Sequence, residues 1–191
     1  MQKKYLIFLI LIAIALPFVQ SKSFYIENAY IKCKINTDGL LEVEEKITVY
    51  FKGSFSEGFR EIKSDGIEIY GVTVLVNNEP TNVKTFYNAD KFRIDWSFSA
   101  ADESKTFTIK YKVKKAVEAY DDVAQLAWIV WSGEWGVPLK ELQGEIELPN
   151  KVADPKEVYT YGHPALQDSE IGLVENLFVF FRASTYKLDK M

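Results

Sequence analysis

The sequence predicts an all-β fold: an antiparallel two-sheet sandwich of immunoglobulin-like architecture, preceded by an N-terminal hydrophobic helix. Three observations lead to this prediction. Apolar and polar residues alternate with period two in many short segments, polar turns separate those segments, and helical periodicity is almost absent. Alternation is typical of half-buried strands because successive side chains point to opposite faces of a sheet. Many short strands joined by polar turns are typical of a sandwich.

The first residues have the form of a secretory leader. Lys3 and Lys4 precede an unbroken apolar run that Pro17 ends, and Val19-Gln20-Ser21 then has the spacing of small or short-chain residues at a cleavage site. An apolar run of about 15 residues would extend roughly 22 Å as a helix, which is less than the ~30 Å core of a bilayer. We therefore expect residues 1–21 to be a signal peptide, or else an N-terminal membrane anchor. Residues 22–191 are expected to form a single β-sandwich domain.

Residues 24–35 and 40–51 form the first expected hairpin. Gly39 lies in the turn between them, where it is free to take a positive φ. In the second strand, Glu45 lies on the apolar face. A buried carboxylate needs a partner because an unpaired buried charge costs several kcal/mol or more. We expect a structural buried ion pair with Arg60, the nearest plausible partner in sequence.

Alternating segments continue to the end of the chain. The further expected strands cover residues 67–76, 83–87, 91–98, 106–114, 142–148, 157–161 and 176–182. Residues 116–125 have mixed signals and are expected to form a helical turn. Residues 126–131 are apolar on both faces, which predicts a fully buried strand.

The composition excludes several classes of protein. Hydrophobic residues make up 48% of the chain and aromatic residues 15%, which excludes a disordered chain. The formal net charge of −4 argues against a nucleic-acid-binding protein, which needs a basic surface. Cys33 is the only cysteine, so an intrachain disulfide is impossible. We expect it to be a small buried residue, with a reactive thiol or an intermolecular bridge as the alternatives.

Three blocks of sequence resemble a known family. They contain Gly58-Phe59-Arg60-Glu61-Ile62, Gly133-Glu134-Trp135 and Gly162-His163-Pro164. Over residues 24–183 the chain is similar to the N-terminal extracytoplasmic domain of the predicted membrane proteins grouped as domain-of-unknown-function family twenty-two-oh-seven. The resemblance implies a β domain on the secreted side, and relatives that continue into a transmembrane helix and a cytoplasmic tail. Since this chain stops at Met191 without such a helix, we expect a secreted short form, a fragment, or a form held by its own leader.

The resemblance implies no activity for this chain, because no activity is established for the family. The residues that match the family pattern are Glu45, Arg60, Asp121, Trp128 and Trp135. Structural roles explain these matches as well as functional ones do. We therefore transfer no catalytic residue to this chain.

The residue types give little support to a catalytic or metal site. His163 is the only histidine, whereas a zinc site needs three or four ligands, usually His and Cys. A Gly-x-Ser-x-Gly nucleophile elbow is also missing from the sequence. We expect no catalytic residue, no metal and no cofactor. The acidic cluster of Glu118, Asp121 and Asp122 is expected to be a solvated loop, with a calcium site or a Glu45–Asp121 acid–base pair as the alternatives.

Three tryptophans follow this acidic cluster. Trp128 and Trp131 have opposite strand parity, so they should face opposite sides, and Trp135 lies in a turn. Packing in the core is the expected role, and a platform for sugar rings is the alternative. The weak candidate binding residues are Trp131, Trp135, Glu118, Asp121 and Asp122.

Together these observations predict a non-enzymatic, extracytoplasmic module that binds or assembles at the cell envelope. It would be secreted or anchored to the outer face of the cytoplasmic membrane, through its leader or a missing C-terminal helix. The expected partner is an envelope protein or a second copy of the chain, joined by strand addition at an exposed edge. No nucleic-acid partner is expected. The alternative is a carbohydrate-binding or carbohydrate-active domain that uses surface tryptophans and nearby carboxylates.

Overall fold

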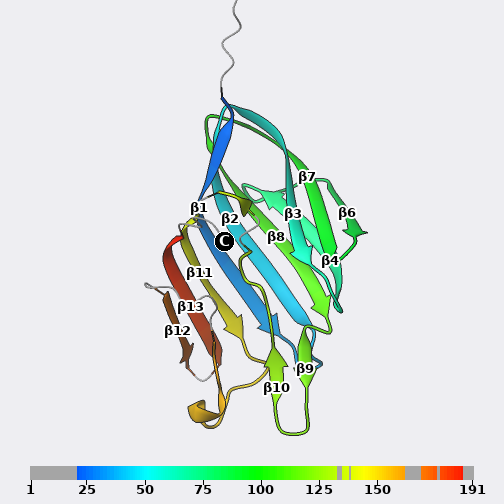
Figure 1. Ribbon diagram of the computed structural model, residues 1–191, viewed down its shortest axis with the longest axis vertical. Coiled ribbons are helices and arrows are strands. Elements are labelled where there is room, and N and C mark those ends of the chain that lie inside the picture. Colours follow the sequence, from blue (N-terminus) through cyan, green and yellow to red (C-terminus); the bar gives the residue numbers. More distant parts are fainter. Residues whose placement is uncertain (1–20, 133–134, 138, 162–168, 176, 187–191) are drawn as a thin grey trace, which may run out of the picture.

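The computed structural model describes residues 21–132, 135–137, 139–161, 169–175 and 177–186. The predicted leader and hydrophobic helix, and His163, lie outside these residues. The described chain is all-β and contains no α-helix, as Figure 1 shows. The all-β prediction is therefore confirmed, whereas the specific immunoglobulin-like arrangement is not.

One large sheet forms most of the molecule. Its eight strands are β1 (Ser23–Ile35), β2 (Leu41–Lys52), β4 (Glu68–Val76), β5 (Glu79–Pro80), β8 (Ser104–Lys114), β11 (Leu139–Glu147), β12 (Ser169–Val174) and β13 (Phe178–Tyr186). Their order across the sheet is β12-β13-β11-β1-β2-β8-β4-β5. The prediction of a purely antiparallel fold is wrong at one place, because β1 and β11 pair in parallel, from Ile26 opposite Leu139 onward.

A smaller sheet lies beside β2, β8 and β4. It contains β3 (Ser54–Lys63), β6 (Val83–Asn88) and β7 (Lys91–Ala101), in the order β3-β7-β6. β2 passes almost directly into β3 through Gly53, which has a φ of +81°. The backbone N–H of Gly53 donates to Asp102 Oδ1 at 2.7 Å. This glycine lets the chain leave one sheet and enter the other, because a positive φ is strained for other residues.

The two sheets share one hydrophobic core. In β2, every second side chain is buried, which is the alternation expected from its sequence. Ile31, Ile47 and Ile109 of the large sheet belong to the same buried cluster as Ile94 and Trp96 of the small sheet. The small sheet therefore covers only part of the large one, on the side of β2, β8 and β4 (Figure 1).

The outer face of the large sheet carries rows of alternating charge. The strand register places Lys32 of β1 between Glu145 of β11 and Glu44 of β2, and Glu44 is next to Lys110 of β8. Lys32 and Glu145 form an ion pair of 2.9 Å, and so do Lys110 and Glu44. The next row, two residues along, repeats the pattern with Glu147, Lys34, Glu42 and Lys112. Opposite charges on neighbouring strands support this register.

Two local predictions between β8 and β11 are wrong. The segment expected to be a helical turn is a hairpin of β9 (Val117–Ala119) and β10 (Ala124–Leu126). The strand expected over residues 126–131 ends at Leu126, and the side chain of Ile129 is 54% exposed. Asp121 and Asp122 lie in the bend between these two short strands, and the apolar residues that follow Leu126 form a loop in place of a strand.

Two further predictions fail near the C-terminus. Residues 157–161 were expected to form a strand, but Glu157 ends a 3-10 turn, Pro155–Glu157, and residues 158–161 pair with no described strand. β12 was not predicted, and it pairs with β13 from Ser169 opposite Ala183. Its sequence has a glycine in the middle, and glycine weakens a strand signal.

Candidate functional site

A buried polar group joins three strands in the interior. Glu45 of β2, Arg60 of β3 and Tyr111 of β8 are 1%, 4% and 2% exposed. Arg60 Nε donates to Glu45 Oε2 at 2.9 Å, and Arg60 Nη2 donates to Glu45 Oε1 at 3.3 Å. The hydroxyl of Tyr111 donates to Glu45 Oε1 at 2.6 Å. The pair expected from the sequence is thus present, and it connects the large sheet with the small one.

Further contacts surround this group, and burial keeps the neighbouring hydroxyl and thiol neutral. Arg60 Nη1 also donates to the carbonyl of Glu61 at 2.7 Å, and the Arg60 guanidinium lies 5.5 Å from the ring centre of Trp135. Burial, and then the negative charge of Glu45, raise the pKa of Tyr111 well above its usual value. Burial and the same carboxylate raise the pKa of Cys33 to about 12. Cys33 is therefore a neutral thiol in a closed interior, which is the environment of an unreactive cysteine.

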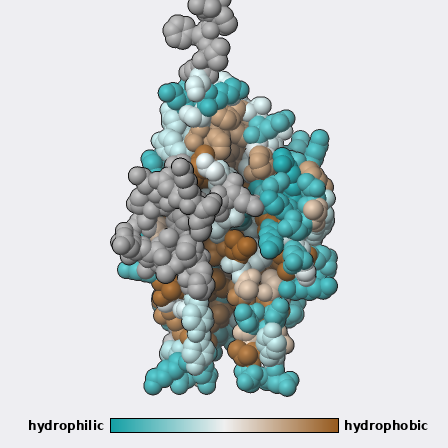
Figure 2. All heavy atoms as spheres, viewed as in Figure 1, coloured by the Kyte–Doolittle hydropathy of each residue, from teal (hydrophilic) through white to brown (hydrophobic). Residues whose placement is uncertain are grey.

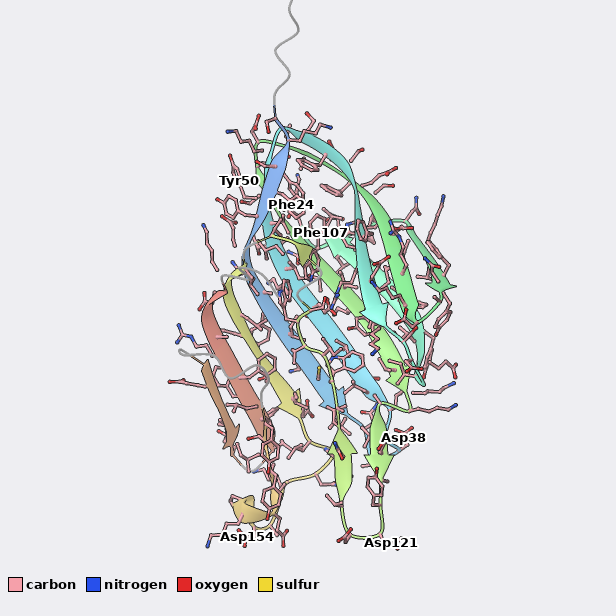
Figure 3. All side chains as sticks on the ribbon, in the orientation of Figure 1. Phe24, Asp38, Tyr50, Phe107, Asp121 and Asp154 are labelled. Carbon is pink, nitrogen blue, oxygen red and sulfur yellow. The ribbon has the colours of Figure 1, made fainter. Side chains whose placement is uncertain are left out.

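An apolar cleft of about 310 Å³ opens between the two sheets. Its lining residues come from β1, β2, β3, β7 and β8 and from the loop before β11. They are Phe24, Ile47, Val49, Phe51, Phe55, Glu57, Gly58, Phe59, Arg60, Glu61, Trp96, Phe98, Phe107, Ile109, Ser132 and Trp135. Figure 3 shows Phe24 and Phe107 in the upper half of the molecule. Figure 2 shows hydrophobic atoms at the surface in the middle of the molecule, with hydrophilic atoms to their right.

Three polar atoms in the residues that line this cleft are buried without a hydrogen bond. They are the indole Nε1 atoms of Trp96 and Trp135 and the Oγ of Ser132, and none has a partner among the described residues. The indole of Trp96 lies directly over Gly58, because a Cβ at Gly58 would be 2.7 Å from the Trp96 ring. Buried donors without partners are rare in proteins and need an explanation.

A second opening lies between β4 and β6. This groove, of about 400 Å³, is lined by Ile69, Tyr70, Gly71, Val72, Val83, Thr85, Phe86, Tyr87 and Phe92. The Tyr87 hydroxyl accepts from the Ile69 N–H at 2.9 Å and donates to the Ile69 carbonyl at 3.3 Å. Phe86 and Tyr87 are nevertheless 45% and 52% exposed. β6 is the last strand of its sheet, so among the described strands it has a partner, β7, along one edge only.

The candidate tryptophans lie next to each other. The rings of Trp131 and Trp135 stack at 5.1 Å with an interplanar angle of 6°. Both side chains are partly buried against the core, as is Trp128, whose ring is 6.4 Å from that of Tyr111. Since one face of each ring is covered by the other, the pair is unlike an open platform. The geometry gives the carbohydrate alternative no support.

The candidate carboxylates lie elsewhere. Asp121 is at the tip of the β9–β10 hairpin, at the lower end of the molecule in Figure 3. It is exposed, as are Glu118 and Asp122. Glu118 accepts a hydrogen bond of 2.7 Å from the Tyr120 hydroxyl. Glu45 is buried in the interior, so the structure does not bring Glu45 and Asp121 together as an acid–base pair. In the described ranges, no three His, Cys, Asp or Glu side chains gather as a metal site would require.

Sequence reasoning missed both openings. Phe55, Phe59 and Ile62 were expected to be apolar anchors in a loop, but they belong to the edge strand β3, which has a register shift between Phe55 and Glu57. A sequence signal did exist, because an isolated glycine within a strand often marks a close approach of another group. Gly58 meets the Trp96 indole in this way.

The fold and its openings define an all-β domain of two packed sheets, with an interior ion pair and an apolar cleft. The chain belongs to the family described as "Predicted membrane protein (DUF2207) N-terminal domain", whose model matches residues 25–187. The description is consistent with association with a membrane. No helix in the described part of the chain combines the length and hydropathy that a membrane span requires.

Comparison with curated proteins gives no match. Among solved structures, the chain is similar to yeast leukotriene A4 hydrolase in complex with bestatin, at 8% identity and a TM-score of 0.48, over 83% of this chain and 26% of that one. It is also similar to a putative protease from Parabacteroides distasonis, at 10% identity and a TM-score of 0.45, over 85% of this chain and 35% of that one. An M1 zinc metallopeptidase from Deinococcus radiodurans is 9% identical with a TM-score of 0.44, over 89% of this chain and 40% of the other. The chain therefore spans well under half of each of these proteins, and likeness at this level carries no conclusion about function.

Proposed function

We propose that this domain is a non-enzymatic binding module on the outer side of a membrane. In this proposal it recognises an envelope protein, or a second copy of itself, through the free edge of β6. The family description supports association with a membrane, and the leader-like first residues support a position on its outer side. The observation that carries the proposal is the edge strand β6 beside its groove.

The free edge of β6 has the properties of a strand-addition site. An edge strand presents unpaired N–H and C=O groups, and an extended segment can pair with them. Five of the six residues in β6 are exposed, and they include Phe86 and Tyr87. The adjoining groove has apolar walls from Ile69 and Val72. In strand addition, main-chain hydrogen bonds give affinity, and pockets for alternate side chains give specificity.

The other edges are less suitable for an added strand. β5 has two residues and contains Pro80, which cannot donate to a ladder. β3 bends at a register shift and carries Glu57 and Glu61, and bulges and charges protect edges against pairing. β12 borders on residues 162–168, which lie outside the described chain. β6 has neither a proline nor a register shift, and its only charged residue is Lys84.

Site-specific cross-linking in the native membrane tests this proposal. A photoreactive benzoyl-phenylalanine at position 86 of the full chain should form an adduct with one defined protein. The control position is Lys46, which is exposed on β2 but has β1 and β8 on its two sides. The mass of the adduct tells an envelope protein from a second copy of the chain.

A variant of the groove makes the test specific. Thr85→Glu places a charge in the groove at an exposed position, where substitutions rarely change stability by more than about 0.5 kcal/mol. The adduct at position 86 should disappear in this variant while the unfolding midpoint stays the same. An adduct that also forms from position 46, or that survives Thr85→Glu, would overturn the proposal.

A further inference from the structure

We propose that the partner at the β6 edge is a second copy of this chain, and that the two β6 strands pair antiparallel about a two-fold axis at Thr85. This inference rests on the proposed function and narrows it, because it selects one of the two kinds of partner. The two small sheets would join into one continuous sheet with the β6 strands at its centre. In such an interface both copies use the same surface patch.

The backbone of β6 has three residues whose polar groups point away from β7. A two-residue turn connects β6 to β7, and Asn88 lies opposite Lys91 next to it. The pair next to such a turn exchanges backbone hydrogen bonds, and bonded and non-bonded pairs then alternate along the ladder. The N–H and C=O groups of Val83, Thr85 and Tyr87 therefore face away from β7. β6 is the outermost strand on the right of Figure 1, and among the described strands it has no partner on that side.

Contacts at both ends hold β6 in place without a partner. The Tyr87 hydroxyl forms hydrogen bonds with both backbone groups of Ile69 in β4, and its ring packs 4.8 Å from that of Phe92. Just before the other end of β6, the Thr81 hydroxyl donates to the carbonyl of Ser97 at 2.8 Å. A strand that is already fixed loses less conformational entropy when another strand pairs with it.

One antiparallel register of β6 with itself uses all three outward residues. With the axis at Thr85, this residue lies opposite Thr85 of the second copy, and Val83 lies opposite its Tyr87. With the axis at Lys84 or Phe86, two of the three outward residues would pair within the strands. The axis at Lys84 would also place two lysines opposite each other, and like charges in that position are destabilising. The register centred on Thr85 is therefore the favoured one.

The side chains that meet in this register are complementary. Thr85 meets a second threonine, and Val83 meets the ring of Tyr87; threonine pairs and aromatic–β-branched pairs both stabilise neighbouring strands. Lys84 lies opposite Phe86, which is 45% exposed in the single chain, and an ammonium group is attracted to the face of such a ring. Because Lys84 is the only charge in β6, no like charges are opposed. This self-complementarity favours a second copy over an unrelated protein.

Cysteine cross-linking between two differently tagged full chains in the native membrane tests the register. Lys84→Cys in one chain and Phe86→Cys in the other place two thiols on a non-bonded pair, whose Cα atoms are about 4.5 Å apart, a separation that a disulfide can join. Mild oxidation should give at least tenfold more linked dimer from this mixture than from either variant alone. Thr85→Cys should link to itself. The natural protein gives the background from Cys33, which is buried.

Matched variants show whether the β6 edge produces the dimer. Thr85→Glu added to both chains places two carboxylates opposite each other and should lower the yield of linked dimer about fivefold or more. Thr85→Val is the matched control, since it keeps a β-branched residue at the axis and should retain the yield. Lys46→Cys, on the exposed face of the large sheet, reports random collisions. The unfolding midpoint of each variant shows that it folds.

Three results would exclude this dimer. Linkage of Lys84→Cys or Phe86→Cys to itself at the level of the mixture would mean another register. Equal yields from Thr85→Glu and Thr85→Val would mean that the strands do not pair at this position. A yield no higher than that of Lys46→Cys would exclude a second copy as the partner. In that last case, an adduct of a different protein at position 86 would leave the strand-addition proposal standing, whereas no adduct at all would exclude both.

Discussion

Arg60 of the small sheet donates two hydrogen bonds to Glu45 of the large sheet, and the shorter is 2.9 Å. The side chains are only 5% and 2% exposed. A buried ion pair adds little stability compared with apolar residues of the same shape, but loss of one partner leaves a buried charge unpaired. The pair therefore acts as a constraint on how the two sheets meet. Any other placement of β3 on β2 would separate the two charges.

Removal of Glu45 should strongly destabilise the fold. Glu45→Ala leaves the guanidinium of Arg60 buried without its carboxylate and the Tyr111 hydroxyl without its acceptor. We expect a loss of about 3–5 kcal/mol in the free energy of unfolding, measured by urea titration. Glu44→Ala is the control: Glu44 pairs with Lys110 on the exposed face, and such pairs contribute about 1 kcal/mol or less. Equal losses in the two variants would contradict the role of the buried pair.

The parallel pairing of β1 and β11 should depend on the glycine at position 144. A Cβ there would be 2.1 Å from the carbonyl oxygen of Ile31 and 2.3 Å from the ring of Phe181. The backbone oxygen cannot move without breaking the ladder, so Gly144→Ala should cost about 3 kcal/mol or more, or prevent folding.

The matched control for this change is Gly172→Ala on β12, where a Cβ would meet nothing within 4 Å. Its effect on the unfolding midpoint should be small or favourable, because alanine restricts the unfolded chain more than glycine does. Thermal unfolding of both variants by circular dichroism gives the comparison. A Gly144→Ala protein as stable as the control would show that β1 and β11 do not approach as closely as described.

Alkaline pH should weaken the fold through Cys33. Burial raises the pKa of this thiol from 9.0 to about 12. Below pH 9 the thiol is neutral in both states and its contribution to stability is complete. Between pH 9 and 12 only the unfolded thiol loses its proton, so stability falls by up to about 1.4 kcal/mol per pH unit. Tyr111, whose pKa is raised in the same direction, adds to the loss above pH 10.

The variant Cys33→Ala isolates the contribution of the thiol to the loss of stability at alkaline pH. It should be less stable at neutral pH because of the missing sulfur, but its free energy of unfolding should fall less steeply from pH 9 to 10.5. Between pH 9 and 10.5, the free energy of unfolding should fall by about 2 kcal/mol more in the natural protein than in the variant. Parallel curves would mean that the thiol ionises equally easily in the folded and unfolded chain. A thiol reagent at pH 8 should label the natural protein only as it unfolds.

Charge reversal at one position on the outer face should show whether the alternating charges stabilise the large sheet. Lys32→Glu puts a third carboxylate between Glu145 and Glu44. We expect a loss of about 1 kcal/mol at low salt, and most of it should disappear in 1 M NaCl because salt screens exposed charges. Lys46→Glu is the control on the same face of the sheet, because the cross-strand neighbours of Lys46 are the uncharged Tyr30 and Thr108. Equal, salt-independent losses would contradict this explanation.

The sequence was most informative where period-two alternation was undisturbed. In β2 and β8 the apolar residues mark the buried face without error, and Glu45 stands out because it breaks that pattern. A charged residue at a core position of the pattern predicts a buried partner from the sequence alone. Its partner Arg60 could be suggested only because β3 follows β2 so closely.

The openings depend on contacts that local patterns do not contain. The cleft exists because β2 continues into a different sheet at Gly53, so that Phe24, Phe51 and Phe98 meet from three strands. The parallel partner of β1 lies more than a hundred residues further along the chain, and alternation cannot specify which strand becomes a neighbour. The β9–β10 hairpin was missed because its strands have three residues each, which is too short for a period to appear.

The distance in sequence between Ile26 and Leu139, which lie opposite each other in the sheet, has a consequence for the newborn chain. A ribosome adds the residues between them at roughly 5–20 residues per second. One edge of β1 therefore has no partner strand for on the order of ten seconds, until β11 has been synthesised. During that interval the half-made sheet has an open edge with unpaired backbone N–H and C=O groups. A holding chaperone present at that stage should raise the yield of correctly folded protein more than one supplied after synthesis is complete.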